Sequence, residues 1–466
     1  MNQHDPIATA FDRQRADTAR RRVEFGLAER RQALARLKET IDRRERDIVA
    51  ALAADFSKPE AETIFSEIMP VSMDIAHARS HLRSWMKPKR VMPTLATLGT
   101  SARIRPEPRG VCLIIAPWNY PFNLAFGPLV SALAAGNSAI IKPSELTPAT
   151  SRLIAEIVAE TFPPELVTVF EGDKDVAQRL LDLPFDHIFF TGSPEVGKIV
   201  MAAAAKNLTS VTLELGGKSP TIVGPGADIA KAAKWIAFGR FANAGQTCIA
   251  PDHLFVHRSV EEKLTAALRK EIAGFYGESA KASPHLARIV SDRHADRMRD
   301  LLKDALGKGA RVAHGGDSDG RYVGPTLIEA VTPQMRLDQE EIFGPILPIM
   351  AYDDLDEVIA RINERPKPLA LYVFERDRAF ADKVIAGTSS GAVSVNAAII
   401  HYTHPGLPFG GVNHSGIGSA HGVFGFRAFS HDKPILTNRF SALPMLFPPY
   451  TDRVMGLIRT ARKMLG

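Results

Sequence analysis

The feature that most constrains the fold is a regular alternation of short apolar runs with helical patterns between residues 111 and 205. The runs VCLIIAPW, SAIIKPS, LVTVFEG and HIFFTGS have the length of strands and lead into glycine, proline or polar residues. Helical spacing of apolar residues follows them at 127–135, 149–160, 174–183 and 195–205. This alternation predicts βαβ units, a parallel sheet and therefore an α/β fold.

Further segments extend the α/β pattern on both sides. Residues 18–54 and 60–86 show helical spacing, and residues 89–105 predict a protruding arm in which SARIR alternates like an edge strand. From about residue 215 a second series of apolar runs begins, with PTIVGP, HLFVHRS, LALYVFE and GAVSVN. A chain of 466 residues predicts about two to four domains.

Charge and cysteine content argue against several classes of protein. The 58 Lys and Arg residues are interleaved with 52 Asp and Glu residues, which indicates a solvated surface and not a nucleic-acid partner. Two cysteines cannot form a disulfide framework, and the first residues lack the apolar run of a secretion signal, so we expect a cytoplasmic protein. The longest apolar runs fall short of the roughly 20 residues of a membrane-spanning helix. His401 and His404 lack the spacing of a ligand set, so we predict no metal site.

The two cysteines stand in different surroundings. Cys112 lies within VCLII, among residues that pack, and reads as an inert thiol in a buried strand. Cys248 follows Gly245, Gln246 and Thr247, whose small and polar side chains could let a substrate approach. A thiolate at this position would be a strong nucleophile toward a carbonyl carbon, so Cys248 is a candidate catalytic residue.

Glu214 is a candidate general base. It follows a β-rich run in VTLELGGKSP and precedes Gly216 and Gly217, which places it at the end of a strand. Catalytic groups in α/β proteins gather at strand ends. The residue pattern alone also allows a surface or salt-bridged glutamate.

The stretch FFTGSPEVGK predicts a strand, a glycine turn and a helix. Gly192 and Ser193 end the strand and Gly197 lies near the start of the helix, an element that can direct backbone N–H groups at a phosphate. The stretch departs from the Gly-x-Gly-x-x-Gly fingerprint, so a plain tight turn stays open.

Three further stretches carry polar or aromatic candidates. Asn119 in APWNYPFN offers an amide that could donate to a developing oxyanion. Lys142 and Glu145 in IIKPSELTP could engage sugar hydroxyls, and EEIFGPILP offers Glu341 and Phe343.

Together these stretches resemble the aldehyde dehydrogenase superfamily. The motifs APWNYPFN, AAGNSAIIKPSE, FFTGSPEVGK, VTLELGGKSP, GQTCIAPD, EEIFGP and LPFGG occur in the family's order, and the similarity runs from about residue 20 to 435. TLELGGKSP, HYTHPGLPFGGVNHSGIGSAHG and FSHDKP look most like the class 3 branch, which handles medium-chain, fatty and aromatic aldehydes. EIMPVSMDIAHARSHLRSWMKPKRV is similar to coniferyl-aldehyde dehydrogenase relatives.

The resemblance implies a mechanism. Cys248 would attack the aldehyde, and the Asn119 amide with the Cys248 backbone N–H would hold the oxyanion. After hydride transfer, Glu214 would activate the water that hydrolyses the thioester to a carboxylic acid. Relatives that pass the acyl group to coenzyme A usually lack this glutamate, so a CoA-acylating enzyme is an alternative that Glu214 disfavours. A catalytically silent structural or binding protein is the other alternative.

The resemblance also implies a cofactor site. Gly192, Ser193 and Gly197 would lie near the pyrophosphate, and Lys142 with Glu145 at the adenine ribose. The remaining cofactor-binding positions would be Trp118, and at the nicotinamide ribose Glu341 and Phe343. A carboxylate beside the ribose disfavours a 2′-phosphate, so NAD is expected, with NADP left open by the class 3 resemblance.

By the same analogy the chain would divide into a Rossmann-like cofactor domain (1–88 and 106–214), an α/β catalytic domain (215–428), a bridging sheet (89–105 and 429–440) and a tail helix (441–466). Such an arm usually pairs with a second subunit, so we expect a homodimer.

The end of the chain, TDRVMGLIRTARKMLG, predicts a basic amphipathic helix. A helix of this kind can lie on a membrane surface or pack on protein. We favour packing over the protein's own substrate entrance, and we expect His401 and His404 to line or flank that funnel.

Overall fold

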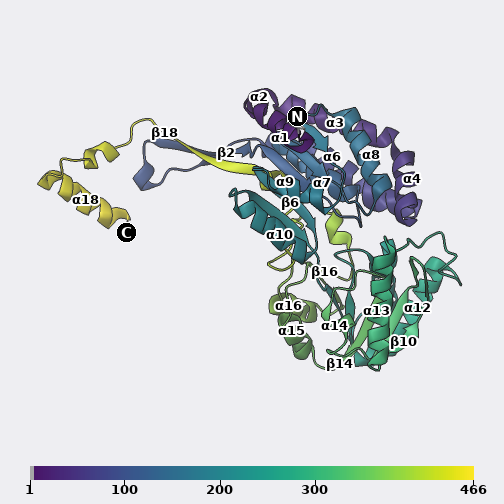
Figure 1. Ribbon diagram of the computed structural model, residues 1–466. Helices are drawn as coiled ribbons and strands as arrows, with labels where there is room; N and C mark the ends of the chain where they lie inside the picture. The colour runs from purple at the N-terminus through teal and green to yellow at the C-terminus, as the bar shows by residue number, and fades with distance from the viewer. Residues whose placement is uncertain (1–4, 466) are drawn as a thin grey trace.

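The computed structural model describes residues 5–465, which form two lobes and a long arm (Figure 1). Residues 1–4 of the predicted cofactor domain and residue 466 of the predicted tail lie outside the described residues. Within this range the chain forms a six-stranded sheet, a seven-stranded sheet, a three-stranded arm sheet and a short hairpin. The α/β prediction is confirmed.

The six-stranded sheet has the order β17-β7-β6-β3-β4-β5 within the described chain. Every strand except β17 runs parallel to its neighbours, and the connections α7 (Asn123–Ala135), α8 (Pro148–Thr161), α9 (Lys174–Leu181) and α10 (Pro194–Ala205) lie where the spacing predicts them. The strands are β3 (Val111–Ile115), β4 (Ser138–Lys142), β5 (Val167–Val169), β6 (His187–Gly192), β7 (Ser210–Leu215) and β17 (Gly416–Ile417). The order reverses between β3 and β6, which creates the kind of crevice that binds ligands in open α/β sheets.

Alternating side chains of β3 enter two separate cores, as the two-residue period of a strand requires. Val111, Leu113 and Ile115 pack in a cluster with residues of α1 (Pro6–Ala16), α9 and α10. Cys112 and Ile114 belong to the larger core that contains residues of α3 (Leu27–Arg43), α7 and α8. Both faces of the sheet are therefore covered.

The N-terminal helical region is divided. Residues 18–56 form α2 (Thr18–Glu24), α3 and α4 (Glu45–Phe56), and Gly26 precedes α3. The next segment comprises α5 (Glu60–Thr63), a π-helical turn η1 (Ile64–Ile68) and α6 (Met69–Trp85). Such π turns often occur at functional sites.

The seven-stranded sheet has the order β10-β13-β14-β9-β8-β15-β16 among the described residues. The four predicted strands appear as β8 (Pro220–Val223), β9 (His253–His257), β15 (Ala370–Phe374) and β16 (Ala392–Val395). The strands β10 (Arg311–His314), β13 (Thr326–Glu329) and β14 (Ile346–Tyr352) were not predicted. Helices α11 (Ile229–Phe241), α12 (Glu261–Tyr276), α13 (Asp292–Gly307), α15 (Leu355–Asn363) and α16 (Arg378–Gly387) complete this lobe.

The arm sheet consists of β1 (Lys89–Val91), β2 (Thr100–Pro108) and β18 (Ser430–Asn438), all antiparallel. SARIR belongs to β2, the central strand, so the edge-strand prediction is wrong, because β18 returns from far along the chain to cover it. Figure 1 shows the arm leading away from both lobes to α18 (Asp452–Leu465).

The tail helix stands apart from both lobes (Figure 1). The tail helix begins only at Asp452, after the short turn η6 (Leu443–Leu446). It lies at the far end of the arm, so the prediction that it covers the chain's own substrate entrance is wrong (Figure 1).

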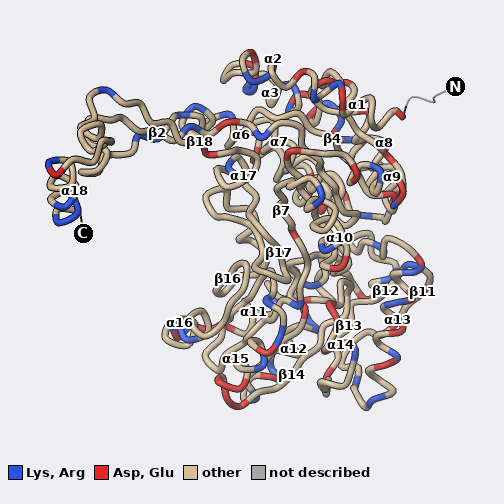
Figure 2. Tube along the Cα trace, turned by 60° about the vertical axis from the view of Figure 1, so that its left-hand side comes forward, with Lys and Arg blue, Asp and Glu red and all other residues tan. Residues whose placement is uncertain are grey.

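Figure 2 shows basic and acidic residues interleaved over the lobes. Across residues 5–465, no helix is both long and apolar enough to cross a membrane.

Candidate active site

A cavity of about 300 Å³ is lined by residues of both lobes. Its walls are mainly apolar, with Met69 from α6, Leu124 from α7, Phe238 from α11 and Phe409. Cys248 and Glu214 both line it, so the structure brings the predicted nucleophile and the predicted base to one space. The cavity suits an elongated apolar molecule with one reactive end.

The Cys248 loop has a strained backbone. It follows α11 and the short turn η3 (Ala242–Gly245), in which Asn243 and Ala244 have φ values of 55° and 52°. Non-glycine residues rarely adopt this left-handed conformation, and they keep it where surrounding contacts over-determine it. Gly245 also has positive φ, and a Cβ there would collide with the Gly344 carbonyl. The small residues before the cysteine are therefore required by the backbone path and by close packing.

Hydrogen bonds join the Cys248 loop to the Asn119 turn. The Asn243 side-chain amide donates to the Asn119 carbonyl at 2.8 Å, and the Asn119 amide donates to the Gln246 carbonyl at 3.0 Å. The Tyr120 hydroxyl lies 2.7 Å from the Thr247 hydroxyl. An amide nitrogen carries two hydrogens, so Asn119 keeps one for a further acceptor beside Cys248.

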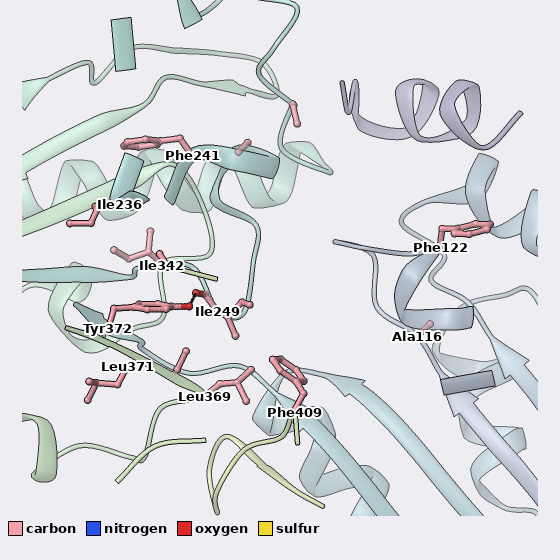
Figure 3. Packing of buried hydrophobic residues seen from close by; sticks show 14 of the residues in the cluster. Ala116, Phe122, Ile236, Phe241, Ile249, Ile342, Leu369, Leu371, Tyr372 and Phe409 are labelled. Atoms are coloured by element: carbon pink, nitrogen blue, oxygen red, sulfur yellow. Dashed lines mark hydrogen bonds between the residues drawn. The ribbon is translucent and has the colours of Figure 1, made fainter. Parts of the chain in front are cut away.

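The other side of the Cys248 loop is fixed to the second sheet. Tyr372 of β15 donates a hydrogen bond of 2.6 Å to the carbonyl of Ile249, the dashed line in Figure 3. Leu369 and Phe409 lie near Ile249 in the same view and also line the cavity. The nucleophile loop is thus held from both lobes.

Burial controls the protonation of the cysteines. Burial, together with the neighbouring Glu341 and Glu214 carboxyls, raises the pKa of Cys248 to about 12. Burial therefore favours the thiol over the thiolate at neutral pH. Cys112 is fully buried in β3 and burial also raises the pKa of its thiol, which agrees with an inert role.

Glu214 is the next-to-last residue of β7, where it pairs with Thr191 and Gly416. It is 5% exposed, and neither carboxylate oxygen has a hydrogen-bond partner in the described part of the chain. Burial raises its pKa well above the usual range. The alternative of a surface or salt-bridged glutamate is therefore wrong, because this carboxyl has been desolvated at a cavity wall without compensation.

Four of the predicted cofactor residues lie at the carboxyl edge of the first sheet. β4 ends in Lys142, whose ammonium lies 2.7 Å from the Glu145 carboxylate, and β6 ends in Gly192. Ser193 caps α10 by accepting a hydrogen bond from the Val196 N–H.

A Cβ at Gly197 would lie 2.8 Å from Leu215, so glycine lets α10 approach β7 closely. These features fit a dinucleotide, since the first turn of α10 presents backbone N–H groups at the edge where phosphate would lie.

The remaining predicted cofactor residues, Trp118, Glu341 and Phe343, lie close to one another. Trp118 packs edge-on against Phe343 with ring centroids 5.3 Å apart. The Glu341 carboxyl lies so close to Gly216 that a Cβ there would collide with it. Burial raises the pKa of Glu341 to about 8. Arg297 donates to the carbonyls of Glu341 and Ile342, at 2.7 Å in each case, and fixes this segment.

The sequence analysis missed several cavity residues. Asp74 and His421 line the cavity with a carboxylate oxygen and a ring nitrogen 3.5 Å apart, and Tyr402 accepts a hydrogen bond from Asn123. They lie in stretches that carry the family resemblance, but nothing in those stretches indicates that Asp74 meets His421. His401 packs beside Tyr372 and Phe409, flanking cavity residues Ile400 and Tyr402, as expected for a residue beside the funnel. The described residues contain no cluster of three or more potential metal ligands.

Comparison with known proteins decides the family. The model of the aldehyde dehydrogenase family matches residues 8–435. The chain belongs to the aldehyde dehydrogenase family. The 4,4'-diaponeurosporen-aldehyde dehydrogenase of Staphylococcus aureus is 47% identical to this aldehyde dehydrogenase over 406 residues, covering 87% of this chain and 88% of the relative. Aldehyde dehydrogenase family 3 member A2 of Mus musculus is 43% identical over 428 residues, covering 91% and 87%.

A solved structure extends the comparison. Staphylococcus aureus AldH in a substrate-bound state matches this aldehyde dehydrogenase with a TM-score of 0.93 and 43% identity, covering 98% of this chain and 99% of that one. The class 3-like resemblance and the Rossmann-like fold are confirmed. The protein is an NAD(P)-dependent aldehyde dehydrogenase, which oxidises an aldehyde.

Proposed function

We propose that Cys248, Glu214 and Asn119 carry the catalytic steps. The observation that carries this proposal is the exposure of Cys248 and of the unpartnered Glu214 carboxyl to one apolar cavity. Cys248 Sγ loses its proton to solvent and forms a bond to the aldehyde carbon, whose carbonyl oxygen becomes an oxyanion. The Asn119 amide and the Cys248 N–H donate to the resulting oxyanion.

The later steps need a hydride acceptor and a water molecule. A bound nicotinamide would supply the hydride acceptor for the thiohemiacetal carbon, and this oxidation would leave a thioester on Cys248. Glu214 then takes a proton from water, the hydroxide adds to the thioester carbon, and the carboxylic acid leaves as the Cys248 thiolate is released. Apolar walls around the sulfur limit the entry of other water.

The residues that would hold the dinucleotide follow its length along the cleft. Gly192, Ser193 and Gly197 would place α10 at the pyrophosphate, and Lys142 with Glu145 would bind the adenine ribose. Glu341 and Phe343 would bind the nicotinamide ribose, with Trp118 packed against Phe343. We expect NAD to be preferred because the Glu145 carboxylate repels a 2′-phosphate, while the neighbouring Lys142 leaves room for use of NADP.

Replacement of the nucleophile tests the mechanism. Cys248→Ser should lower aldehyde-dependent NADH production by about 1000-fold or more, because a serine hydroxyl without an activating base is a far weaker nucleophile. Cys112→Ser is the matched control, since it changes the same chemistry in a strand of the first lobe. Full activity of the Cys248 variant would overturn the assignment.

The cavity supports aliphatic or aromatic aldehydes as substrates. Its walls are mainly apolar, as an apolar aldehyde would require. One relative is named as a 4,4'-diaponeurosporen-aldehyde dehydrogenase, which is consistent with such a substrate. Comparison of kcat/KM for hexanal, decanal, benzaldehyde and coniferaldehyde would rank these classes, and a preference for short polar aldehydes would contradict the proposal.

We also propose a homodimer formed through the arm, because the arm exposes large apolar side chains. We propose in the same way that the chain divides into a cofactor domain, a catalytic domain, a bridging sheet and a tail. Cys112 and Cys248 are free, and a reducing compartment such as the cytoplasm would keep the nucleophile reduced.

A further inference from the structure

Three charged side chains from the segment before α6 lie beneath the active-site loops. Lys58 and Glu67 are fully buried and form an ion pair, with 2.6 Å between Nζ and Oε1. Glu62 lies in α5, which begins shortly after Lys58, and its negative charge helps to keep the Lys58 ammonium protonated. Glu62 lies in α5 and Glu67 lies within the π turn η1, and the two carboxylates serve different loops.

Glu67 holds the Asn119 turn. Its second carboxylate oxygen accepts a hydrogen bond of 2.9 Å from the backbone N–H of Asn123. The paired Lys58 ammonium lies 4.0 Å from the centre of the Tyr120 ring, within the range of a cation–π contact. Tyr120 in turn meets the hydroxyl of Thr247, the residue before Cys248. The ion pair therefore contacts the residues that directly follow Asn119.

Glu62 holds the Cys248 loop. Its carboxylate accepts a hydrogen bond of 2.8 Å from the backbone N–H of Asn243. Asn243 is the first of two consecutive left-handed non-glycine residues before the nucleophile, so this bond lies where the strained stretch of backbone begins. The segment that carries Glu62 and Glu67 thus contacts both the Asn119 turn and the Cys248 loop, which must face each other during catalysis.

We propose that Lys58, Glu62 and Glu67 are positioning residues that set the distance between Asn119 and Cys248. The inference rests on the proposed roles of those two residues. Apolar side chains of similar volume often replace a buried ion pair without loss of stability, so stability alone does not require these charges. Their directed bonds to Asn123, Tyr120 and Asn243 instead fix a geometry in which small displacements are costly to rate.

The test uses side chains that keep shape while removing charge or one bond. Glu67→Gln, Glu62→Gln and Tyr120→Phe are compared with the control Glu375→Gln. Glu375 is also buried and accepts backbone N–H bonds, but it follows β15 at the end opposite the cavity residue Leu369. Active sites are counted with a thiol reagent in each variant, and kcat and KM are measured for the counted sites.

We expect kcat per counted site to fall by about 10- to 100-fold in Glu67→Gln, with the KM for NAD unchanged. A further variant, Glu62→Ala, should lose more kcat than Glu62→Gln, because glutamine keeps an oxygen for the Asn243 N–H. Tyr120→Phe should show the smallest loss of kcat. Glu375→Gln should keep its kcat per counted site. Variants that lose counted sites but keep full kcat at the remaining ones would show a merely structural role and overturn the proposal.

The same experiment separates this inference from the proposed function. Full activity of Cys248→Ser would remove the nucleophile assignment, whereas loss of activity in that variant with full kcat in Glu67→Gln and Glu62→Ala would remove only the positioning role.

Discussion

The catalytic cleft and the arm differ in how far their side chains are buried. In the cleft, Asn119, Asn243 and Gln246 are buried and bonded to one another, and Tyr372 anchors the next turn from the second lobe. In the arm, Met92 is 84% exposed and Phe440 is 79% exposed, although both are large and apolar. The amide side chains of the cleft hydrogen-bond within the chain, whereas the arm exposes large apolar side chains of the kind found at interfaces.

On the cleft side of this comparison, removal of the proposed general base should lower turnover strongly. Glu214→Gln should lower steady-state kcat by about 100- to 1000-fold, because a neutral amide cannot take a proton from water. A first burst of NADH, up to one per active site, should persist if Glu214 serves mainly in thioester hydrolysis. Rapid-mixing absorbance measures both phases, and unchanged turnover would break the assignment.

On the arm side, charge should disrupt assembly. Leu436→Asp combined with Phe440→Asp should weaken dimerisation by about 100-fold or more, since large apolar anchors dominate interface energy. Light scattering over a range of concentrations measures the change. Leu306→Asp, at an exposed apolar position on α13 of the second lobe, is the control. A monomeric parent protein, or a variant that remains fully dimeric, would remove the contrast between the two regions.

The protonation of the cleft predicts a pH dependence. Burial raises the pKa of Cys248 to about 12 and that of Glu214 well above its usual value, so the reactive base forms become populated as pH rises. We expect kcat to increase from pH 6 to pH 9, by up to about tenfold per pH unit where one deprotonation limits the rate. A pH–rate profile that is flat or falls over this range would contradict the inferred resting state.

The smallest effect on activity should come from Cys112. Cys112→Ala should lower the free energy of unfolding by about 1–2 kcal/mol, because it removes a buried sulfur from the centre of β3. Activity per folded chain should stay unchanged, and denaturant titration with a parallel assay separates the two quantities. A loss of activity without loss of stability would mean that the two cysteines are less distinct than their surroundings indicate.

Local patterns were sufficient for much of the fold. The runs around β3, β4, β5 and β6 were visible because parallel strands buried on both faces are almost continuously apolar. The strands β10 and β13 escaped detection because their segments are short, whereas β14 was missed although ILPIMAY is almost continuously apolar. All three strands pair with segments distant in the chain. The same reason explains SARIR, whose central position depends on β18 more than 300 residues later.

The sequence by itself determined the order of strands and helices, the family motifs and the candidates Cys248, Glu214 and Asn119, because these depend on residue type and on neighbours along the chain. Only the tertiary structure decided that the thiol rests protonated, that Lys58, Glu62 and Glu67 lie under the active-site loops, and that the tail helix stands away from the cavity. Desolvation and long-range contacts arise from groups that the fold alone brings together.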